Sequence, residues 1–133
     1  ALGIVARTVP QMNVLVVDDS VTARHHIRRV LNNMGIANVT EVTNGRQAIE
    51  QIKQNFFDLI VTDYNMPEID GQQLTRYVRE KSTQRSVPIL MVTSLKDETR
   101  LAQVQQSGVS AICDKPFEPS GIKNLVRKML LVD

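Results

Sequence analysis

Residues 58–71 have the sequence DLIVTDYNMPEIDG, in which a short apolar run ends at Asp63 and a loop follows. The apolar run is too short for a typical helix and does not alternate with polar residues, a pattern typical of a strand covered on both faces. Pro67 and Gly71 then favour a loop over a continued strand. This stretch predicts a buried strand that presents the carboxylate of Asp63 at its carboxyl end.

The same alternation of apolar runs and helical spacing extends in both directions from this stretch. Similar runs occupy residues 14–17 and 89–92, and further strands are predicted at residues 39–42 and 110–114. Segments with apolar residues at helical spacing follow each of these runs. Strands that alternate with helices are typical of a parallel sheet built by right-handed crossovers. We therefore predict an α/β fold with a five-stranded parallel sheet and five helices.

Two of the predicted helices have specific boundaries. The first begins after Ser20, a good N-cap residue, and ends at Gly35. The last is predicted over residues 120–132, with Ser120 as its N-cap. The apolar side chains of the first helix that we expect to face the core are Val21, Ile27, Val30, Leu31 and Met34.

Composition limits the class of protein to which the chain can belong. The apolar fraction of 42% and the charged fraction of 23% are ordinary for a globular domain. No apolar run approaches the ~20 residues of a membrane span. Cys113 is the only cysteine, which excludes an intrachain disulfide and a cysteine-cluster metal site.

Charge and the N-terminal residues bear on the binding partners, the location and the domain bounds that we predict. A net charge of +2 is too small to predict nucleic-acid binding, and the basic residues around Arg24 and Arg28 are expected to form a solvent-exposed helix face. The first ten residues lack the features of a secretory signal, so we expect a cytoplasmic protein without membrane contacts. Residues 1–12 fall outside the alternating pattern and are predicted to be an extension or linker before one domain at residues 13–133.

Polar residues follow several of the predicted strands, at the edge where open parallel sheets bind ligands. The residues at this edge are Asp18, Asp19, Asp63, Thr93 and Lys115. Carboxylates so close together are costly without a cation, and carboxylate oxygens favour a hard cation such as Mg²⁺, which often also binds phosphate oxygens. With Lys115 as a second cation and Thr93 as a hydrogen-bond donor, the pocket is suited to a phosphoryl group.

A carboxylate can also be the nucleophile of phosphoryl transfer. Asp63 is the best candidate for this role, because it ends the central strand and precedes a loop that can bring its backbone near the ligand.

Four motifs together resemble those of response-regulator receiver domains, the CheY-like family. They are VLVVDDS at residues 14–20, DLIVTDYNMPEIDG at 58–71, PILMVTS at 88–94 and DKPF at 114–117. The resemblance covers nearly all of the chain and implies a flavodoxin-like three-layer sandwich with strand order 2-1-3-4-5. This order is known for the family and does not follow from the residues alone.

The resemblance also implies a role for each site residue. Asp63 would be the phosphoacceptor, and Mg²⁺ would bind to Asp63, to Asp19 directly, to Asp18 mostly through water, and to the backbone carbonyl of Asn65. Thr93 would be the switch hydroxyl, and Lys115 would pair with the phosphoryl group. Pro116 resembles the family's cis-proline.

The chain departs from the family pattern at Ile112, where members commonly have an aromatic residue that swings inward with the switch hydroxyl. We expect the readout here to depend on backbone shift and aliphatic repacking. The resemblance places the output face on the fourth helix, the fifth strand and the fifth helix. Lys96, Arg100, Ile112, Lys123 and Arg127 lie there.

These features predict a signalling switch in a two-component phosphorelay. A histidine kinase or histidine phosphotransfer protein would supply the phosphoryl group, and a downstream effector protein or an attached output domain would read the altered surface. We expect no enzyme activity beyond self-phosphorylation from phosphodonors and slow autodephosphorylation.

Two other functions remain open from the sequence. One is an interaction module that has kept the fold without phosphorylation. The other is a Mg²⁺-dependent phosphohydrolase with an aspartyl-phosphate intermediate. The phosphohydrolase is disfavoured because Asn65 stands where such an enzyme would have a second acid, two residues after Asp63.

Overall fold

The computed structural model describes residues 11–115 and 118–130, without the side chain of Leu130. Strands and helices alternate throughout these ranges. In chain order they are β1 (Asn13–Val17), α1 (Val21–Asn33), β2 (Asn38–Val42), α2 (Gly45–Gln54), β3 (Leu59–Thr62), α3 (Gly71–Lys81), β4 (Ile89–Thr93), α4 (Glu98–Gln106), β5 (Ala111–Asp114) and α5 (Pro119–Leu130). The predicted extension at residues 1–12 lies almost wholly outside the described part, as does Pro116.

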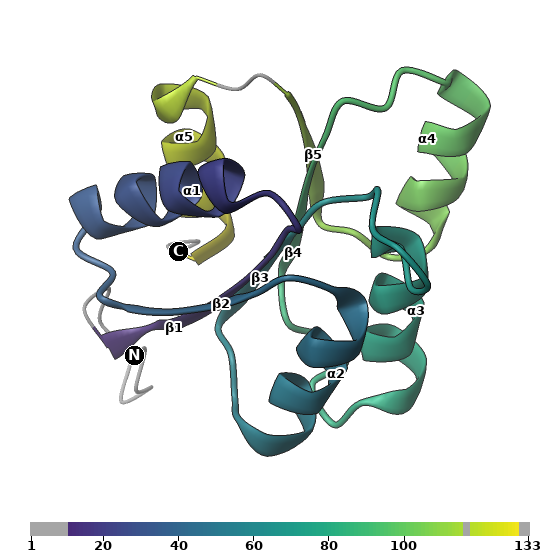
Figure 1. Cartoon of the computed structure of the whole chain (residues 1–133), viewed down its shortest axis with the longest axis horizontal. Coiled ribbons are helices and arrows are strands. Elements are labelled where there is room, and N and C mark those ends of the chain that lie inside the picture. Colours follow the sequence, from purple (N-terminus) through teal and green to yellow (C-terminus); the bar gives the residue numbers. More distant parts are fainter. Residues whose placement is uncertain (1–10, 116–117, 131–133) are drawn as a thin grey trace, which may run out of the picture.

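The strands form one parallel sheet in the order β2-β1-β3-β4-β5, which confirms the predicted fold. Helices α1 and α5 cover one face of the sheet, and α2, α3 and α4 lie on the other (Figure 1). The central position of β1 and β3 places their carboxyl ends in the middle of one sheet edge. Among the described residues, no helix combines the length and apolar character of a membrane span.

Strand β1 shows why the apolar runs do not alternate. Val14 and Val16 belong to the core between the sheet and α1 and α5, and Leu15 and Val17 to the core on the other face. All four are fully buried. A strand covered on both faces needs apolar side chains at every position, which is the pattern read from the sequence.

Helix α1 begins and ends as predicted, but Val21 does not face the core. The hydroxyl of Ser20 accepts a hydrogen bond from the Ala23 N–H at 3.2 Å, and Gly35 follows the helix with a φ of 95°. Val21 is 53% exposed. It precedes the buried Val30 by two and a half turns, at ~3.6 residues per turn, and so points to the opposite side.

Helix α5 begins earlier than predicted, at Pro119, so the assignment of Ser120 as the N-cap is wrong. The N–H groups of Gly121 and Ile122 donate to the carbonyl of Glu118, at 3.0 and 3.3 Å, which places Glu118 at the cap position. Pro119 then occupies the first helical position, where its fixed φ suits the helix and its missing N–H costs no hydrogen bond.

Candidate functional site

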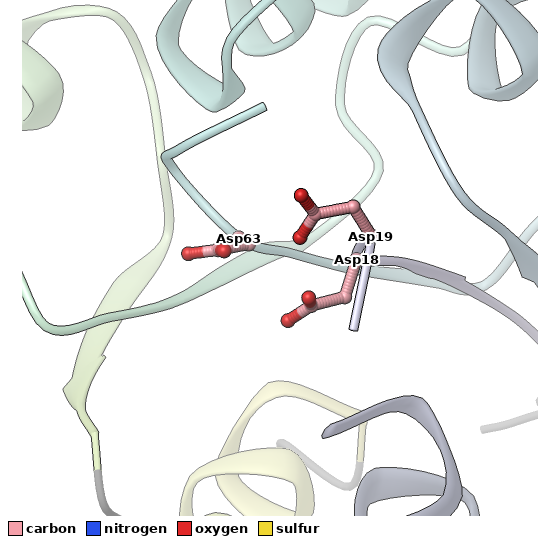
Figure 2. Close-up of side chains that lie close together, drawn as sticks. All are labelled: Asp18, Asp19 and Asp63. Carbon is pink, nitrogen blue, oxygen red and sulfur yellow. The ribbon is translucent and has the colours of Figure 1, made fainter. Parts of the chain in front are cut away.

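Three aspartates meet at the carboxyl edge of the sheet (Figure 2). Asp18, Asp19 and Asp63 each offer a carboxylate oxygen, and these atoms all lie within 4.8 Å of one another. Asp18 and Asp63 are buried, with exposed fractions of 1% and 8%, whereas Asp19 is exposed to solvent. Two acids are therefore anchored in the fold and one lies at the mouth of the site.

Strand register brings these acids together. Val17 of β1 pairs with Thr62 of β3, and the residue after each is an aspartate. The N–H of Asp63 donates to the carbonyl of Val17 at 2.9 Å, so the ladder continues into the site. Adjacent parallel strands that end at the same level must present their next residues side by side, which confirms that the Asp18-Asp19 pair and Asp63 share one site.

Lys115 is the cation of the site. Its Nζ donates to Asp18 Oδ2 at 2.9 Å and lies 3.4 Å from Asp63 Oδ2. The Lys115 N–H also donates to the carbonyl of Thr93 at 2.9 Å, which fixes the segment after β5 against the end of β4. Burial opposes the charged ammonium, but the hydrogen bond to Asp18 and the charge of Asp63 outweigh it and raise the pKa of Lys115.

The surroundings of Asp63 raise the pKa of its carboxyl and so favour the protonated form. Burial raises the pKa of its carboxyl most, and the negative charge of Asp18 adds to this. The charge of Lys115 and the hydrogen bond from the Tyr64 N–H, 2.7 Å from Asp63 Oδ1, act the other way without cancelling it. The ammonium of Lys115 therefore compensates the charge of Asp63 only in part, and a divalent cation would add further positive charge.

Thr93 is the last residue of strand β4, and Asn65 lies in the loop after β3. Thr93 is fully buried, and its hydroxyl oxygen accepts a hydrogen bond from the Leu95 N–H at 3.2 Å. Asn65 is exposed two residues after Asp63. Their roles as switch hydroxyl and metal ligand remain predictions.

Arg24 and Arg28 correct the prediction of a purely solvated basic face on α1. Arg24 Nη1 donates to the backbone carbonyl of Asp18 at 2.7 Å, and its Nε binds Glu41 on β2 at 3.2 Å. Arg28 also binds Glu41. Burial acts to raise the pKa of Glu41, but the two guanidinium groups outweigh it and lower that pKa. Arg24 thus supports the turn that carries Asp18, a contact that residue spacing does not reveal.

Gly71 permits a close approach of the loop after β3. A Cβ at this position would lie 2.4 Å from the backbone oxygen of Asp63, closer than atoms can pack. Instead, the Gly71 N–H donates to the carbonyl of Tyr64 at 2.9 Å. This glycine lets α3 begin directly against the backbone of Asp63.

Carboxylates dominate the site, and their oxygens are the ligands that Mg²⁺ prefers. Asp18, Asp19 and Asp63 fit such an ion, because three negative charges face the single ammonium of Lys115.

Comparison with known proteins identifies the family. The family model of the response regulator receiver domain matches residues 14–127. The chain belongs to the response regulator receiver family. The chemotaxis protein CheY of Pseudomonas aeruginosa is 34% identical over 118 residues, covering 89% of this chain and 95% of the relative. The chemotaxis protein CheY-3 of Vibrio cholerae is 31% identical over the same length, covering 89% of this chain and 91% of the relative.

Solved structures of other receiver domains have the same fold. The signal receiver domain of a histidine kinase from Syntrophus aciditrophicus matches with a TM-score of 0.84 and 28% identity, over 90% of each chain. The receiver domain of a sensor histidine kinase from Pseudomonas aeruginosa matches with a TM-score of 0.81 and 26% identity, over 90% of this chain and 97% of the other. That structure contains a magnesium ion coordinated in its active site cleft.

Proposed function

We propose that this receiver domain accepts a phosphoryl group on Asp63 and passes the change to a protein-binding surface. One observation carries the proposal. The carboxylate of Asp63 is poised at the end of a central strand, with one oxygen bound by the Tyr64 N–H and the other 3.4 Å from the ammonium of Lys115. A nucleophile beside a fixed cation is what phosphoryl transfer to a carboxylate requires.

The donor is the phosphohistidine of a histidine kinase or of a histidine phosphotransfer protein. One oxygen of the ionised Asp63 carboxylate attacks phosphorus and forms an O–P bond. The N–P bond of the donor breaks, and its electron pair leaves with the imidazole, which takes up a proton. The ammonium of Lys115 lies close enough to pair with the phosphoryl oxygens, and Thr93 provides a hydroxyl donor.

Mg²⁺ would be held by Asp18, Asp19, Asp63 and the backbone carbonyl of Asn65. When bound, it supplies positive charge that stabilises the negative oxygens of the transferring group. The exposed position of Asp19 supports this assignment, because Mg²⁺ usually keeps several of its waters.

The domain acts as a switch that is phosphorylated once and slowly loses the group, and not as an enzyme that turns over a substrate. The absence of an acid at Asn65 supports this assignment, since a phosphohydrolase would use one there. The partner that reads the switch is a downstream effector protein or an attached output domain.

Intact mass after incubation with acetyl phosphate and Mg²⁺ tests this function. We expect one added phosphoryl group in the native chain and none in Asp63→Asn or with a chelator present. Asp97→Asn is the matched control, because Asp97 caps α4 and asparagine is an equally good N-cap, so its phosphorylation is expected to be unchanged. A native chain that never gains mass, from acetyl phosphate or from histidine kinases, would instead indicate an interaction module that works without phosphorylation.

A further inference from the structure

Tyr64 directly follows Asp63 and is 5% exposed. Its ring forms a small apolar cluster with Met91 and Val104, against which Ile112 packs. Ile112 is the position where receiver domains commonly have an aromatic residue. In this chain an aromatic ring therefore reaches the same region from the end of β3, next to the acceptor.

The backbone of Tyr64 is tied to the acceptor on one side and to α3 on the other. Its N–H donates to Asp63 Oδ1 at 2.7 Å, and its carbonyl accepts from the Gly71 N–H at 2.9 Å. The first of these bonds is strengthened by the charge of the carboxylate. A change in the charge of Asp63 thus acts directly on the peptide group of Tyr64.

The side chain of Tyr64 reaches α4, which lies on the same side of the sheet as α2 and α3 (Figure 1). Arg100 Nη1 donates to the Tyr64 hydroxyl oxygen at 2.5 Å, and the guanidinium carbon lies 6.0 Å from the ring centroid, at the limit of a cation–π contact. Val104 follows Arg100 by four residues and so lies on the same side of the helix. Tyr64 therefore contacts two successive turns of α4.

These contacts matter because few others anchor α4. Val104 is the one buried residue of this helix, whereas α1, α2 and α3 each bury three or more. Elements with few buried contacts open at low free-energy cost. Loss of the contacts with Tyr64 is thus expected to loosen α4 more than any other helix on this face.

We propose that Tyr64 is the positioning residue that couples Asp63 to α4 through Arg100. The inference rests on the proposed function. Once one oxygen of Asp63 carries a phosphoryl group, the negative charge lies on the phosphoryl oxygens and the other Asp63 oxygen becomes a neutral carbonyl. The hydrogen bond from the Tyr64 N–H to that carbonyl oxygen is then weaker than the bond to the carboxylate. Tyr64 then shifts, its hydroxyl releases Arg100, and α4 becomes more mobile.

Hydrogen exchange of residues 98–106, measured with and without acetyl phosphate and Mg²⁺, tests this coupling. We expect phosphorylation to speed exchange in the native chain by about 5-fold or more, the lower end of usual coupling between sites. In Tyr64→Phe and in Arg100→Gln, exchange is expected to be fast already and to change little on phosphorylation. The double variant should behave like either single variant, since both remove one interaction.

If the coupling is specific, phosphorylation should still speed the hydrogen exchange of residues 98–106 in two control variants. Tyr77→Phe removes the hydroxyl of the other tyrosine, on α3, and Arg76→Gln removes an exposed arginine from the same helix. Arg100→Gln changes a solvent-exposed side chain, so the domain is expected to fold as the native chain does. Intact mass of the same samples reports phosphorylation independently of α4.

The outcomes separate the coupling from the proposed function. If all variants gain one phosphoryl group and the change in α4 is as large in Tyr64→Phe and Arg100→Gln as in the native chain, the coupling is contradicted and the function stands. If the native chain gains none, both are contradicted. Tyrosine emission gives a second readout, because the chain has no tryptophan and Tyr77→Phe leaves Tyr64 as its only tyrosine. Emission that does not respond to phosphorylation in this variant also contradicts the coupling.

Discussion

At the residue scale, the site is defined by an excess of negative charge. The carboxylates of Asp18, Asp19 and Asp63 face the ammonium of Lys115, and burial is the main reason that the pKa of Asp63 is raised. The folded domain therefore binds a proton at Asp63 more tightly than the unfolded chain does. The protonated Asp63 adds to the free energy of unfolding at low pH. This contribution is lost as pH rises from the ordinary pKa of an aspartate through the raised pKa of Asp63 in the folded domain.

Because the pKa of Asp63 is raised, its charged form is disfavoured in the fold, and we predict that Asp63→Asn stabilises the metal-free domain at pH 7. The amide keeps the shape of the side chain and an acceptor for the Tyr64 N–H but removes the buried charge. We expect a gain on the order of 1 kcal/mol in the free energy of unfolding, the usual size for one partly screened charge. The gain should shrink as pH falls through the raised pKa of the folded domain, because the native Asp63 then becomes protonated and carries no buried charge either. Urea unfolding with a chelator measures it, and a variant less stable than the native chain at pH 7 would contradict the sign.

The acids were predictable from the sequence, but the residues that support them were not. Asp18 and Asp63 each follow an apolar run, and parallel strands must bring their carboxyl ends to one edge. The contacts of Arg24 with the Asp18 carbonyl and of Arg100 with Tyr64 join side chains to groups on other elements. Such contacts depend on how far each side chain reaches in the folded molecule, which neither motif nor periodicity encodes.

At the element scale, buried strands were predicted more accurately than the faces and ends of helices. An unbroken apolar run indicates a strand covered on both faces, and the four apolar residues of β1, at positions 14–17, are buried on alternate faces as this predicts. The two wrong predictions about helices concern Val21 and Ser120. Val21 is apolar, but its angle on α1 opposes that of the buried Val30. Ser120 is a good cap residue by type, but it follows Pro119, which occupies the first helical position.

We predict that a glycine-to-alanine substitution changes the free energy of unfolding in opposite directions at two helix starts. Gly71→Ala would place a Cβ 2.4 Å from the Asp63 oxygen, so we expect a loss of about 1–3 kcal/mol in the free energy of unfolding. A Cβ at Gly121 in α5 would meet no described atom within 4 Å outside its chain neighbours and the backbone of its own helix. We therefore expect Gly121→Ala to gain up to about 1 kcal/mol in the free energy of unfolding, because alanine favours the helix. Thermal and urea unfolding of both variants provide the comparison. Equal effects would show that the contact at Gly71 does not constrain the loop.

At the scale of the whole molecule, the strand order turns distant sequence positions into one site. The residues that directly follow β1, β3 and β5 are Asp18, Asp63 and Lys115. Because all strands run in the same direction, these residues lie at the same edge of the sheet. The topology thereby gathers three of the 14 acidic residues of the chain, and the one that we propose as the acceptor is Asp63. Its neighbours are two further acids, one ammonium and the loop that Gly71 admits.

Chemical mapping of the phosphoryl group tests this selection most directly. The native chain is phosphorylated with acetyl phosphate and Mg²⁺ and then treated with borohydride, which reduces an aspartyl phosphate to homoserine and releases phosphate. Peptide sequencing by mass spectrometry then locates the modified residue. We predict homoserine at position 63 and at none of the other acidic positions. Homoserine at Asp18 or Asp19, or an unmodified Asp63 in a chain that has gained the mass of a phosphoryl group, would contradict the assignment of Asp63 as the acceptor.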